Sequence, residues 1–440
     1  MSAAGLFTPR RAASVVLIAG FCVMLAMNAP GQMSYDSVVQ LADGRTGFYN
    51  SWHPPVMAWL LGLLDFLLPG TLLFLIFQSL LLLASLLTLL WMRPRGWGAV
   101  LVALLVVLTP QWLLYQGEIW KDILFADAAI AGFAALALAA QHGRAAWLIA
   151  SVLLLALAAA TRQNGMVLLP VAAGALALIA RRGGKSGWVH GAGFLLAGLG
   201  LAAAASLTLA GRGDGGDGAQ AEIRFGQSYD LAGALARDPG LRLPALAAAD
   251  PKLDALLRGR GARLYSPLHT DAFAADTRIG DGLVAAPQGA ISRAWRELVL
   301  DHTLLYLRTR LAAFGAVLRT PDSFVCHFAS VGIDGPPALL KSLGLTARIR
   351  PQDQALGDYA RLFFATPVYA HLAWGILALI LLVLLLRRGG AADLAVAALL
   401  TGALLFTLSF VIISLACDYR YLVFLDLSAM AAAIYAISVK

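Results

Sequence analysis

Long apolar stretches, each close to the length of a membrane-spanning helix, recur along most of this chain. Of the 440 residues, 60% are hydrophobic and only 13% are charged, which is too few charges for a soluble protein of this size. Because a helix needs about 20 mostly apolar residues to cross a bilayer, the sequence predicts an all-α polytopic membrane protein with about ten spans. The expected spans are 12–29, 71–92, 97–114, 122–140, 145–160, 164–180, 188–210, 366–386, 392–416 and 421–438.

One further apolar stretch, 54–68, is short, begins with two prolines and contains Asp65, so we expect a helix that lies at the membrane interface. The distribution of basic residues supports this choice. With 54–68 outside the membrane and the N-terminus in the cytoplasm, the short cytoplasmic loops contain basic residues and no acid, as the positive-inside rule requires. The basic residues on that side are Arg10, Arg11, Arg93, Arg95, Arg144, Arg181, Arg182, Lys185, Arg387, Arg388 and Lys440.

The formal net charge of +8 has the same origin, and it therefore does not indicate a nucleic-acid partner. We expect a multi-pass protein of a bacterial inner membrane, surrounded by membrane lipids. Its first helix should remain uncleaved, because the run 12–29 is longer than the apolar core of a signal peptide. Cys326 and Cys417 would both lie on the oxidising periplasmic side, so a disulfide between them is possible.

The pattern of spans divides the chain into three parts. Residues 1–210 are expected to form a transmembrane module, and residues 366–440 to add three more spanning helices. Between them, residues 211–365 contain Pro, Gly and short amphipathic runs, which predicts a mostly helical periplasmic cap. Three arginines in the run 303–320 favour a surface helix over a span in that part.

Polar and charged residues gather at the periplasmic ends of the predicted spans. Such residues are costly there unless they are paired or face water, which makes them candidates for a functional site. The candidates are Asp36, Gln40 and His53 in the first outer loop, Glu118, Lys121 and Asp122 in the second, Arg162 and Asn164 in the third, and Asp418, Arg420 and Tyr421 in the last.

The chemistry that such a set of residues suits is the transfer of a group from a phosphate leaving group. A carboxylate takes the proton of an acceptor hydroxyl, and Lys and Arg hold and neutralise the departing phosphate. Apolar walls nearby suit a lipid tail. The residues leave open whether a divalent metal ion bridges the phosphate and the carboxylates, because no dense cluster of ligands requires one.

The order of these motifs resembles the GT-C class of membrane glycosyltransferases, which includes the protein O-mannosyltransferases and the aminoarabinose transferases of lipid A. The resemblance covers the membrane part well and the stretch 211–365 only loosely. Many members of the class have Asp-Glu at the first position, where this chain has Asp36-Ser37. The matching motifs are Asp36…Gln40…Trp52-His53-Pro54-Pro55, Trp120-Lys121-Asp122, Arg162-Gln163-Asn164-Gly165 and Asp418-Tyr419-Arg420-Tyr421.

The resemblance implies a GT-C-like bundle and the transfer of a hexose or pentose from a polyprenyl-phosphate donor. The acceptor would be a lipid, glycan or protein of the cell envelope at the periplasmic face. Asp36 would be the catalytic residue of the first loop, and Asp122 or Glu118 the acid of the second. The residues implied in substrate binding are Gln40, His53, Lys121, Arg162, Asn164, Arg420 and Tyr421.

Simpler roles stay open for several of these residues. Asp36 follows Ser34 and precedes a helical pattern, so capping of a short helix is an alternative. Lys121 and Asp122 suit a local ion pair, and Arg162 suits contact with lipid headgroups. Two other classes of function are also open: a transporter or flippase of lipid-linked sugars, and a non-catalytic protein of envelope polysaccharide assembly. A flippase predicts charges deep inside helices and an internal repeat, and the sequence shows neither.

Overall fold

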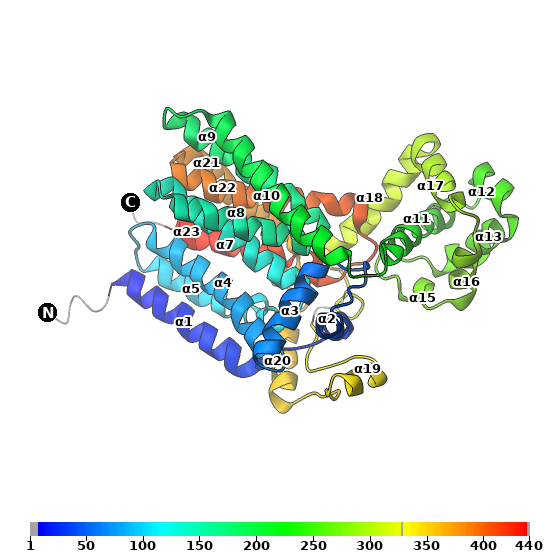
Figure 1. The fold of residues 1–440 in the computed structure, drawn as a ribbon, viewed down its shortest axis with the longest axis horizontal. Helices are drawn as coiled ribbons and strands as arrows, with labels where there is room; N and C mark the ends of the chain where they lie inside the picture. The colour runs from blue at the N-terminus through cyan, green and yellow to red at the C-terminus, as the bar shows by residue number, and fades with distance from the viewer. Residues whose placement is uncertain (1–7, 327–328, 438–440) are drawn as a thin grey trace.

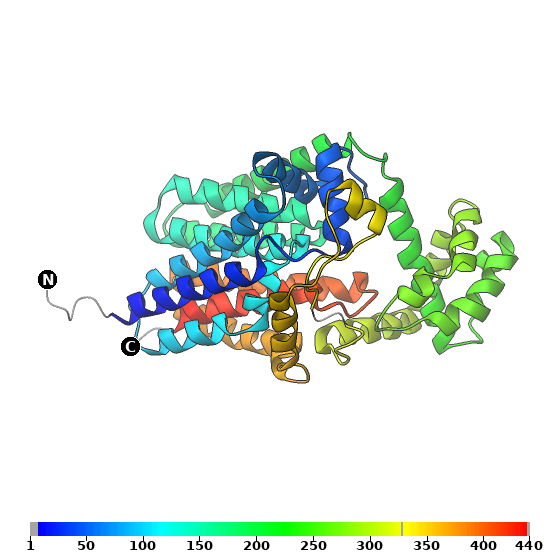
Figure 2. The ribbon, with the colours of Figure 1, turned by 90° about the horizontal axis from the view of Figure 1, so that it is seen from below.

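The computed structural model describes residues 8–326 and 329–437. Within these residues the regular structure is helical, and the β-type pairings are isolated bridges, as between Gln32 and Glu118. The helices form an elongated bundle with the start of α1 (Pro9–Asn28) and the end of α23 (Val423–Ala436) at one end and a smaller helical body beyond the other (Figure 1, Figure 2). The expected all-α fold is confirmed.

Among the described residues, seven helices are long and apolar enough to cross a membrane, so the chain is a polytopic membrane protein. An eighth span results if α5 (Gly98–Val107) and the segment Pro110–Gly117, which meet at a bend of 59°, count as one. Helices α8 (Ala145–Thr161) and α23 (Val423–Ala436) are shorter, so the expected total of ten stays a prediction. The seven are α1 (Pro9–Asn28), α4 (Leu72–Trp91), α7 (Lys121–His142), α9 (Leu168–Arg182) with the preceding turn η3 (Gln163–Val167), α10 (Gly187–Ala210), α21 (His371–Arg388) and α22 (Ala391–Ile413).

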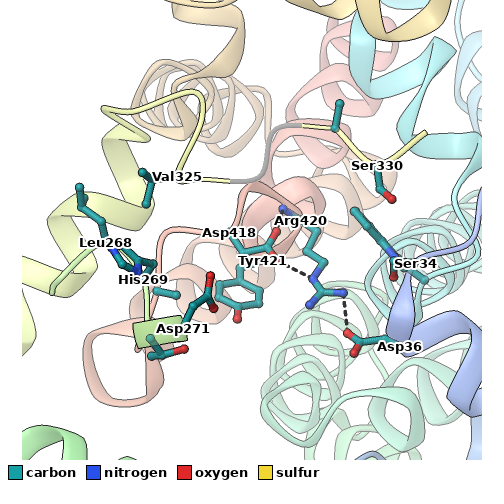
Figure 3. A pocket seen from close by; sticks show the side chains of 14 residues that line it. Ser34, Asp36, Leu268, His269, Asp271, Val325, Ser330, Asp418, Arg420 and Tyr421 are labelled. Atoms are coloured by element: carbon teal, nitrogen blue, oxygen red, sulfur yellow. Dashed lines mark hydrogen bonds and ion pairs between the residues drawn. The ribbon is translucent and has the colours of Figure 1, made fainter. Parts of the chain in front are cut away.

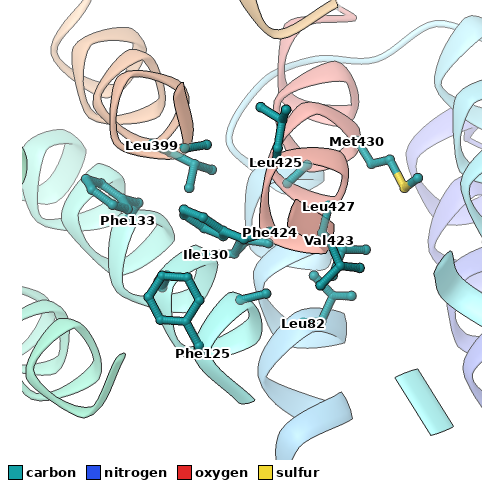
Figure 4. Close-up of a cluster of buried hydrophobic side chains, with 14 of the residues drawn as sticks. Leu82, Phe125, Ile130, Phe133, Leu399, Val423, Phe424, Leu425, Leu427 and Met430 are labelled. Carbon is teal, nitrogen blue, oxygen red and sulfur yellow. The ribbon is translucent and has the colours of Figure 1, made fainter. Parts of the chain in front are cut away.

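Helix α7 lies at the centre of the bundle. Every residue from Asp122 to Ala137 is buried, including Asp127, which accepts a hydrogen bond from Gln116 at 3.0 Å. Phe125 stacks on Phe406 of α22, with ring centroids 4.7 Å apart, and meets Phe424 of α23 edge-on. Figure 4 shows Phe125 and Phe133 of α7 beside Leu399 of α22 and Phe424 of α23. The packed core fixes the axis of α7 and therefore the position of its first turn, which enters the site described below.

Two short helices, α2 (Tyr35–Thr46) and α3 (Pro55–Leu67), lie against each other at the end of the bundle near the smaller body. Helix α3 occupies the stretch that we expected at the membrane interface. The two backbones touch, because a Cβ added to Gly44 would lie 2.3 Å from a backbone oxygen of α3. Arg45 and Asp65 join the helices by a salt bridge of 2.7 Å. These contacts hold the start of α2 over the bundle.

The smaller body, called the cap below, consists of α11 to α18. It has a hydrophobic core of its own, in which Phe273 meets the ring of Tyr229 edge-on. Asp230 accepts hydrogen bonds from Arg310 at 2.6 Å and from Trp295 at 2.8 Å. The elements are α11 (Asp217–Arg237), α12 (Pro244–Ala249), α13 (Pro251–Leu256), η4 (Leu257–Gly261), α14 (Ala262–Leu264), α15 (Asp271–Ala274), α16 (Thr277–Ala285), α17 (Ala290–Asp301) and α18 (Thr303–Arg319).

The chain that follows the cap returns to the bundle before the last spans begin. Helix α19 (Pro337–Ser342) packs on α2, and α20 (Pro351–Arg361) packs on α1. Arg350 donates a hydrogen bond to the carbonyl of Ala29 at 2.6 Å. The turn η5 (Pro367–Tyr369) then leads into α21. The predicted stretch 211–365 therefore includes both the cap and this returning segment, and the three-part division of the chain stays a prediction.

Candidate active site

Two adjoining cavities lie where the bundle meets the cap. The bundle cavity, of 560 Å³, is lined by Lys121, Arg162 and other residues at the ends of α7, α8 and α22. The cap cavity, of 380 Å³, is lined by residues that include Asp271 from the cap (Figure 3). Asp36, Arg420 and Tyr421 line both cavities, so they stand at the junction between them.

Asp36 lies in the first turn of α2 and points to the junction of the cavities. The cap of this helix is Ser34, which forms a capping box with Ser37, so Asp36 is not the capping residue. Its Oδ2 lies 2.7 Å from Nη1 of Arg420, and its Oδ1 lies 3.8 Å from Nε2 of His53. Burial alone would raise the pKa of Asp36, but Arg420 and His53 outweigh it and hold that pKa well below its usual range. Asp36 is therefore a carboxylate at neutral pH.

Arg420 connects the two sides of the junction. It lies in the turn η6 (Tyr419–Leu422), and its Nε is 2.9 Å from Oδ2 of Asp418. Its guanidinium also lies over the ring of Trp120, 4.9 Å from the ring centroid. Burial would lower the pKa of Arg420, but Asp418 and Asp36 raise it above its ordinary value. Arg420 thus keeps its charge while it is shielded from water.

The turn η6 is held from two directions. On one side, a disulfide joins Cys417 to Cys326, which confirms that the two cysteines are close enough to pair. On the other side, the buried Tyr419 hydroxyl donates a hydrogen bond to Asp426 at 2.5 Å. His371 lies between Asp426 and the Tyr419 carbonyl, at 2.9 and 3.0 Å. These contacts fix the backbone from which Asp418 and Arg420 project.

The bundle cavity combines cations with apolar walls. Nζ of Lys121 lies within hydrogen-bond distance of Nδ1 of His53, at 2.9 Å. Arg162 forms an ion pair with Asp122, and its guanidinium lies over the ring of Phe410. Lys121 and Asp122 are therefore not paired with each other, and Arg162 is buried rather than extended to the membrane surface. The apolar walls are Phe410, Ile413 and Leu415.

The cap cavity is polar and is closed in part by a loop of the cap. His269, Thr270 and Asp271 come from that loop, which is tied to the bundle by the hydrogen bond from the Cys417 amide to the Leu268 carbonyl at 2.8 Å. The opposite wall includes Ser34, whose hydroxyl accepts a hydrogen bond from Trp120 at 2.8 Å. Carboxylates and hydroxyls thus line the space on the cap side of Asp36, together with apolar side chains such as Leu268 and Val325.

Most of the residues expected at the site line these cavities, and two do not. Those that do are Asp36, His53, Lys121, Asp122, Arg162, Asn164, Asp418, Arg420 and Tyr421. Glu118 is fully buried beneath the site, where its Oε1 accepts a hydrogen bond from the amide of Ser330 at 3.3 Å. Burial raises the pKa of Glu118 well above its usual range. Gln40 is also buried, on the inner face of α2.

Three titratable residues of the cap line the cavities, although no sequence motif marks them as part of the site. Glu222 of α11 reaches the bundle cavity, and His269 and Asp271 reach the cap cavity. Burial raises the pKa of Glu222, and Lys121 and Arg162 oppose that rise. Single polar residues in a long polar stretch carry no pattern, so only the fold brings them to the site.

Metal binding is not supported by the arrangement of the carboxylates. In residues 8–326 and 329–437, no group of three His, Cys, Asp or Glu side chains is placed to hold a metal ion. Asp36 and Asp418 are both engaged by Arg420, and Asp122 is engaged by Arg162. The described side chains therefore do not fit a divalent metal, and no step below uses one.

No family model and no curated relative matches the chain. Among solved structures, it is similar to the archaeal oligosaccharyltransferase AglB from Archaeoglobus fulgidus, which was solved in complex with an inhibitory peptide and a dolichol-phosphate. The match covers 96% of this chain at 13% sequence identity with a TM-score of 0.42. This chain spans about half of AglB, 49% of its length.

Proposed function

We propose that this protein is a GT-C-like glycosyltransferase that moves a sugar from a polyprenyl-phosphate donor to an acceptor of the cell envelope. The observation that carries the proposal is the position of Asp36. This carboxylate stands at the junction of a cationic cavity with apolar walls and a polar cavity beneath the cap. A reaction between a lipid-linked donor and a hydrophilic acceptor needs such a pair of spaces with a basic group between them.

The bundle cavity suits the lipid-linked phosphate. Lys121 and Arg162 supply two cations for the phosphate oxygens, and Phe410 and Ile413 supply an apolar surface for the first part of the polyprenyl chain. The ion pair with Asp122 orients the Arg162 guanidinium before the donor arrives. Asp122 then acts by positioning Arg162 and not as a second general acid, and the buried Glu118 has no direct role.

The cap cavity suits the acceptor. In the proposed reaction, the acceptor hydroxyl or amine attacks the anomeric carbon of the sugar, and its proton passes to Asp36. A bond forms between the acceptor and that carbon, and the bond between the carbon and the phosphate oxygen breaks. The electron pair stays on the phosphate, where Lys121 and Arg162 neutralise the charge. Arg420 keeps Asp36 ionised and directed at the junction.

The orientation that we propose places this site in the periplasm. The Cys326–Cys417 disulfide lies beside the site, and such bonds form in oxidising compartments and not in the cytoplasm. The basic loops lie at the far end of the bundle: α7 starts in the site at Lys121 and ends next to Arg144. Both features favour a bacterial inner membrane with the site on its outer face.

The proposal is tested with the purified full-length chain in lipid and a panel of radiolabelled polyprenyl-phosphate hexoses and pentoses, with native membrane extract as the source of acceptor. We expect label to leave one of these lipids and to enter a new product. Movement of labelled lipid between leaflets without loss of the sugar would instead identify a flippase. Binding of the lipid with no transfer and no movement would identify a non-catalytic assembly protein.

A further inference from the structure

A third cavity, of 630 Å³, lies at the opposite end of the bundle from the candidate active site. The ends of three helical hairpins surround it: the turns between α7 and α8, between α9 and α10, and between α21 and α22. Trp188, in the first turn of α10 beside the cavity, is 77% exposed. Exposed tryptophans at helix ends are typical of the membrane–water interface. The cavity therefore opens at the level of the lipid headgroups.

The rim of this cavity is basic. Arg144, Arg182, Lys185 and His190 line it, and none of its described lining residues is acidic. Arg182 donates a hydrogen bond to the carbonyl of Gly389 at 2.7 Å, which joins two of the three turns. A further source of positive potential is the start of α8, because the described first turn of this helix carries neither a side-chain cap nor an acid.

The inner wall of the same cavity is apolar. It is formed by small and aliphatic side chains of α7, α8 and α9, among them Ala140, Leu148, Leu176 and Ile179. A small soluble anion would make no apolar contact with such a wall, and an uncharged lipid would form no ion pair with the basic rim. The two together match a molecule with an anionic head and an apolar tail.

We propose that this cavity binds an anionic phospholipid of the leaflet opposite the active site, with its phosphate at Arg144, Lys185 and Arg182 and one acyl chain along Leu148 and Leu176. Basic cavities between transmembrane helices are suited to such headgroups. The bound lipid would bridge the three hairpin ends, two of which are also joined by the Arg182–Gly389 hydrogen bond. The proposal does not depend on the function assigned to the active site.

The test is native mass spectrometry of the full-length protein, released from mild detergent after incubation with equal amounts of phosphatidylglycerol and phosphatidylcholine. We expect the wild type to retain the anionic lipid in preference, and the double variant Arg144→Gln/Lys185→Gln to lose about tenfold or more of that preference. The matched control Arg181→Gln/Arg387→Gln removes two exposed basic residues from the same end of the bundle that do not line the cavity. It should retain the preference.

A second variant, Ala145→Trp, fills the cavity mouth without a change of charge and should also lower retention of the anionic lipid. Equal retention of both lipids by the wild type would overturn the proposal. So would an equal loss of preference in the control, because the basic surface as a whole would then account for binding. Full displacement of the lipid by glycerol 3-phosphate would likewise overturn it, since the site would then recognise a soluble phosphate without a tail.

Discussion

The carboxylate of Asp36 and the guanidinium of Arg420 lie 2.7 Å apart, although 384 residues separate them in the chain. This pair joins the first helix after the first span to the turn before the last helix, and it forms the partition between the two cavities. Closure of the active site therefore requires the N-terminal and C-terminal parts of the bundle to pack correctly against each other.

Replacement of Arg420 by Gln should lower kcat/KM by about 100-fold, because Asp36 loses the charge that orients it. It should also change the pH dependence. In the wild type the pKa of Asp36 lies well below its usual range, so the base is ionised throughout the mildly acidic range. Without Arg420, burial dominates and raises that pKa, so the acid limb of kcat/KM should move to higher pH.

The control for this prediction is Arg45→Gln, which breaks the pair between Arg45 of α2 and Asp65 of α3, outside both cavities. It should lower thermal stability and leave the acid limb in place. An unchanged acid limb in the Arg420 variant would show that the pair does not set the ionisation of the base.

Variants in the two cavities should change the Michaelis constants of different substrates. Lys121→Met should raise KM for the donor lipid by about tenfold, because it removes a charged hydrogen bond to the phosphate, and should leave KM for the acceptor unchanged. Asp271→Asn should do the reverse and raise KM for the acceptor by about fivefold. The measurement is initial rate with each substrate varied in turn. Equal effects of both variants on both constants would refute the assignment of one substrate to each cavity.

The sequence was sufficient to predict the membrane bundle, because apolar length and the sidedness of basic loops are local properties. It was also sufficient to gather candidates at one membrane level. The sequence did not reveal that Glu118 is buried whereas the nearby Lys121 and Asp122 line the bundle cavity. The backbone amide of Gln32 donates a hydrogen bond to the Gly117 carbonyl, and the backbone carbonyl of Gln32 accepts one from the Ile119 amide. Glu118 lies between these two bonds, and its side chain is buried. That backbone pairing depends on packing between distant segments, so the residues next to Glu118 in the sequence do not predict it.

Glu118→Gln is therefore expected to remain active. A buried carboxyl group and an amide have nearly the same shape, and burial raises the pKa of Glu118 well above its usual range. The loss of kcat should stay far below the ~100-fold that follows removal of a general acid or base. The assay is sugar transfer at saturating donor. A loss of kcat as large as that of a general-base variant would show that Glu118 takes part in catalysis.

The Cys326–Cys417 disulfide should support both stability and turnover. It closes a loop with a sequence separation of 91, for which chain entropy gives on the order of 4 kcal/mol. The double variant Cys326→Ser/Cys417→Ser should unfold at lower temperature. It should also lose kcat, because the turn that carries Arg420 is held by this bond. Cys22→Ser, which removes the exposed free cysteine, is the control and should change neither quantity.

The position of the cap residues that line the cap cavity could not be predicted from the sequence. His269 precedes the short helix α15 and Asp271 begins it, in a stretch without a recognisable motif that the hydrogen bond from the Cys417 amide to the Leu268 carbonyl ties to the bundle. Pairings of this kind follow from the final packing of cap on bundle.

The most direct test of the central claim compares donor binding and sugar transfer in one preparation of Asp36→Asn, with Asp43→Asn as the control from the same helix. Asp43 lines neither cavity and should be dispensable. We predict that Asp36→Asn still binds the labelled polyprenyl-phosphate sugar but transfers it at least ~100-fold more slowly, while Asp43→Asn transfers it like the wild type. Transfer by Asp36→Asn at the wild-type rate would contradict the account, because the reaction would then not depend on the carboxylate at the junction of the cavities.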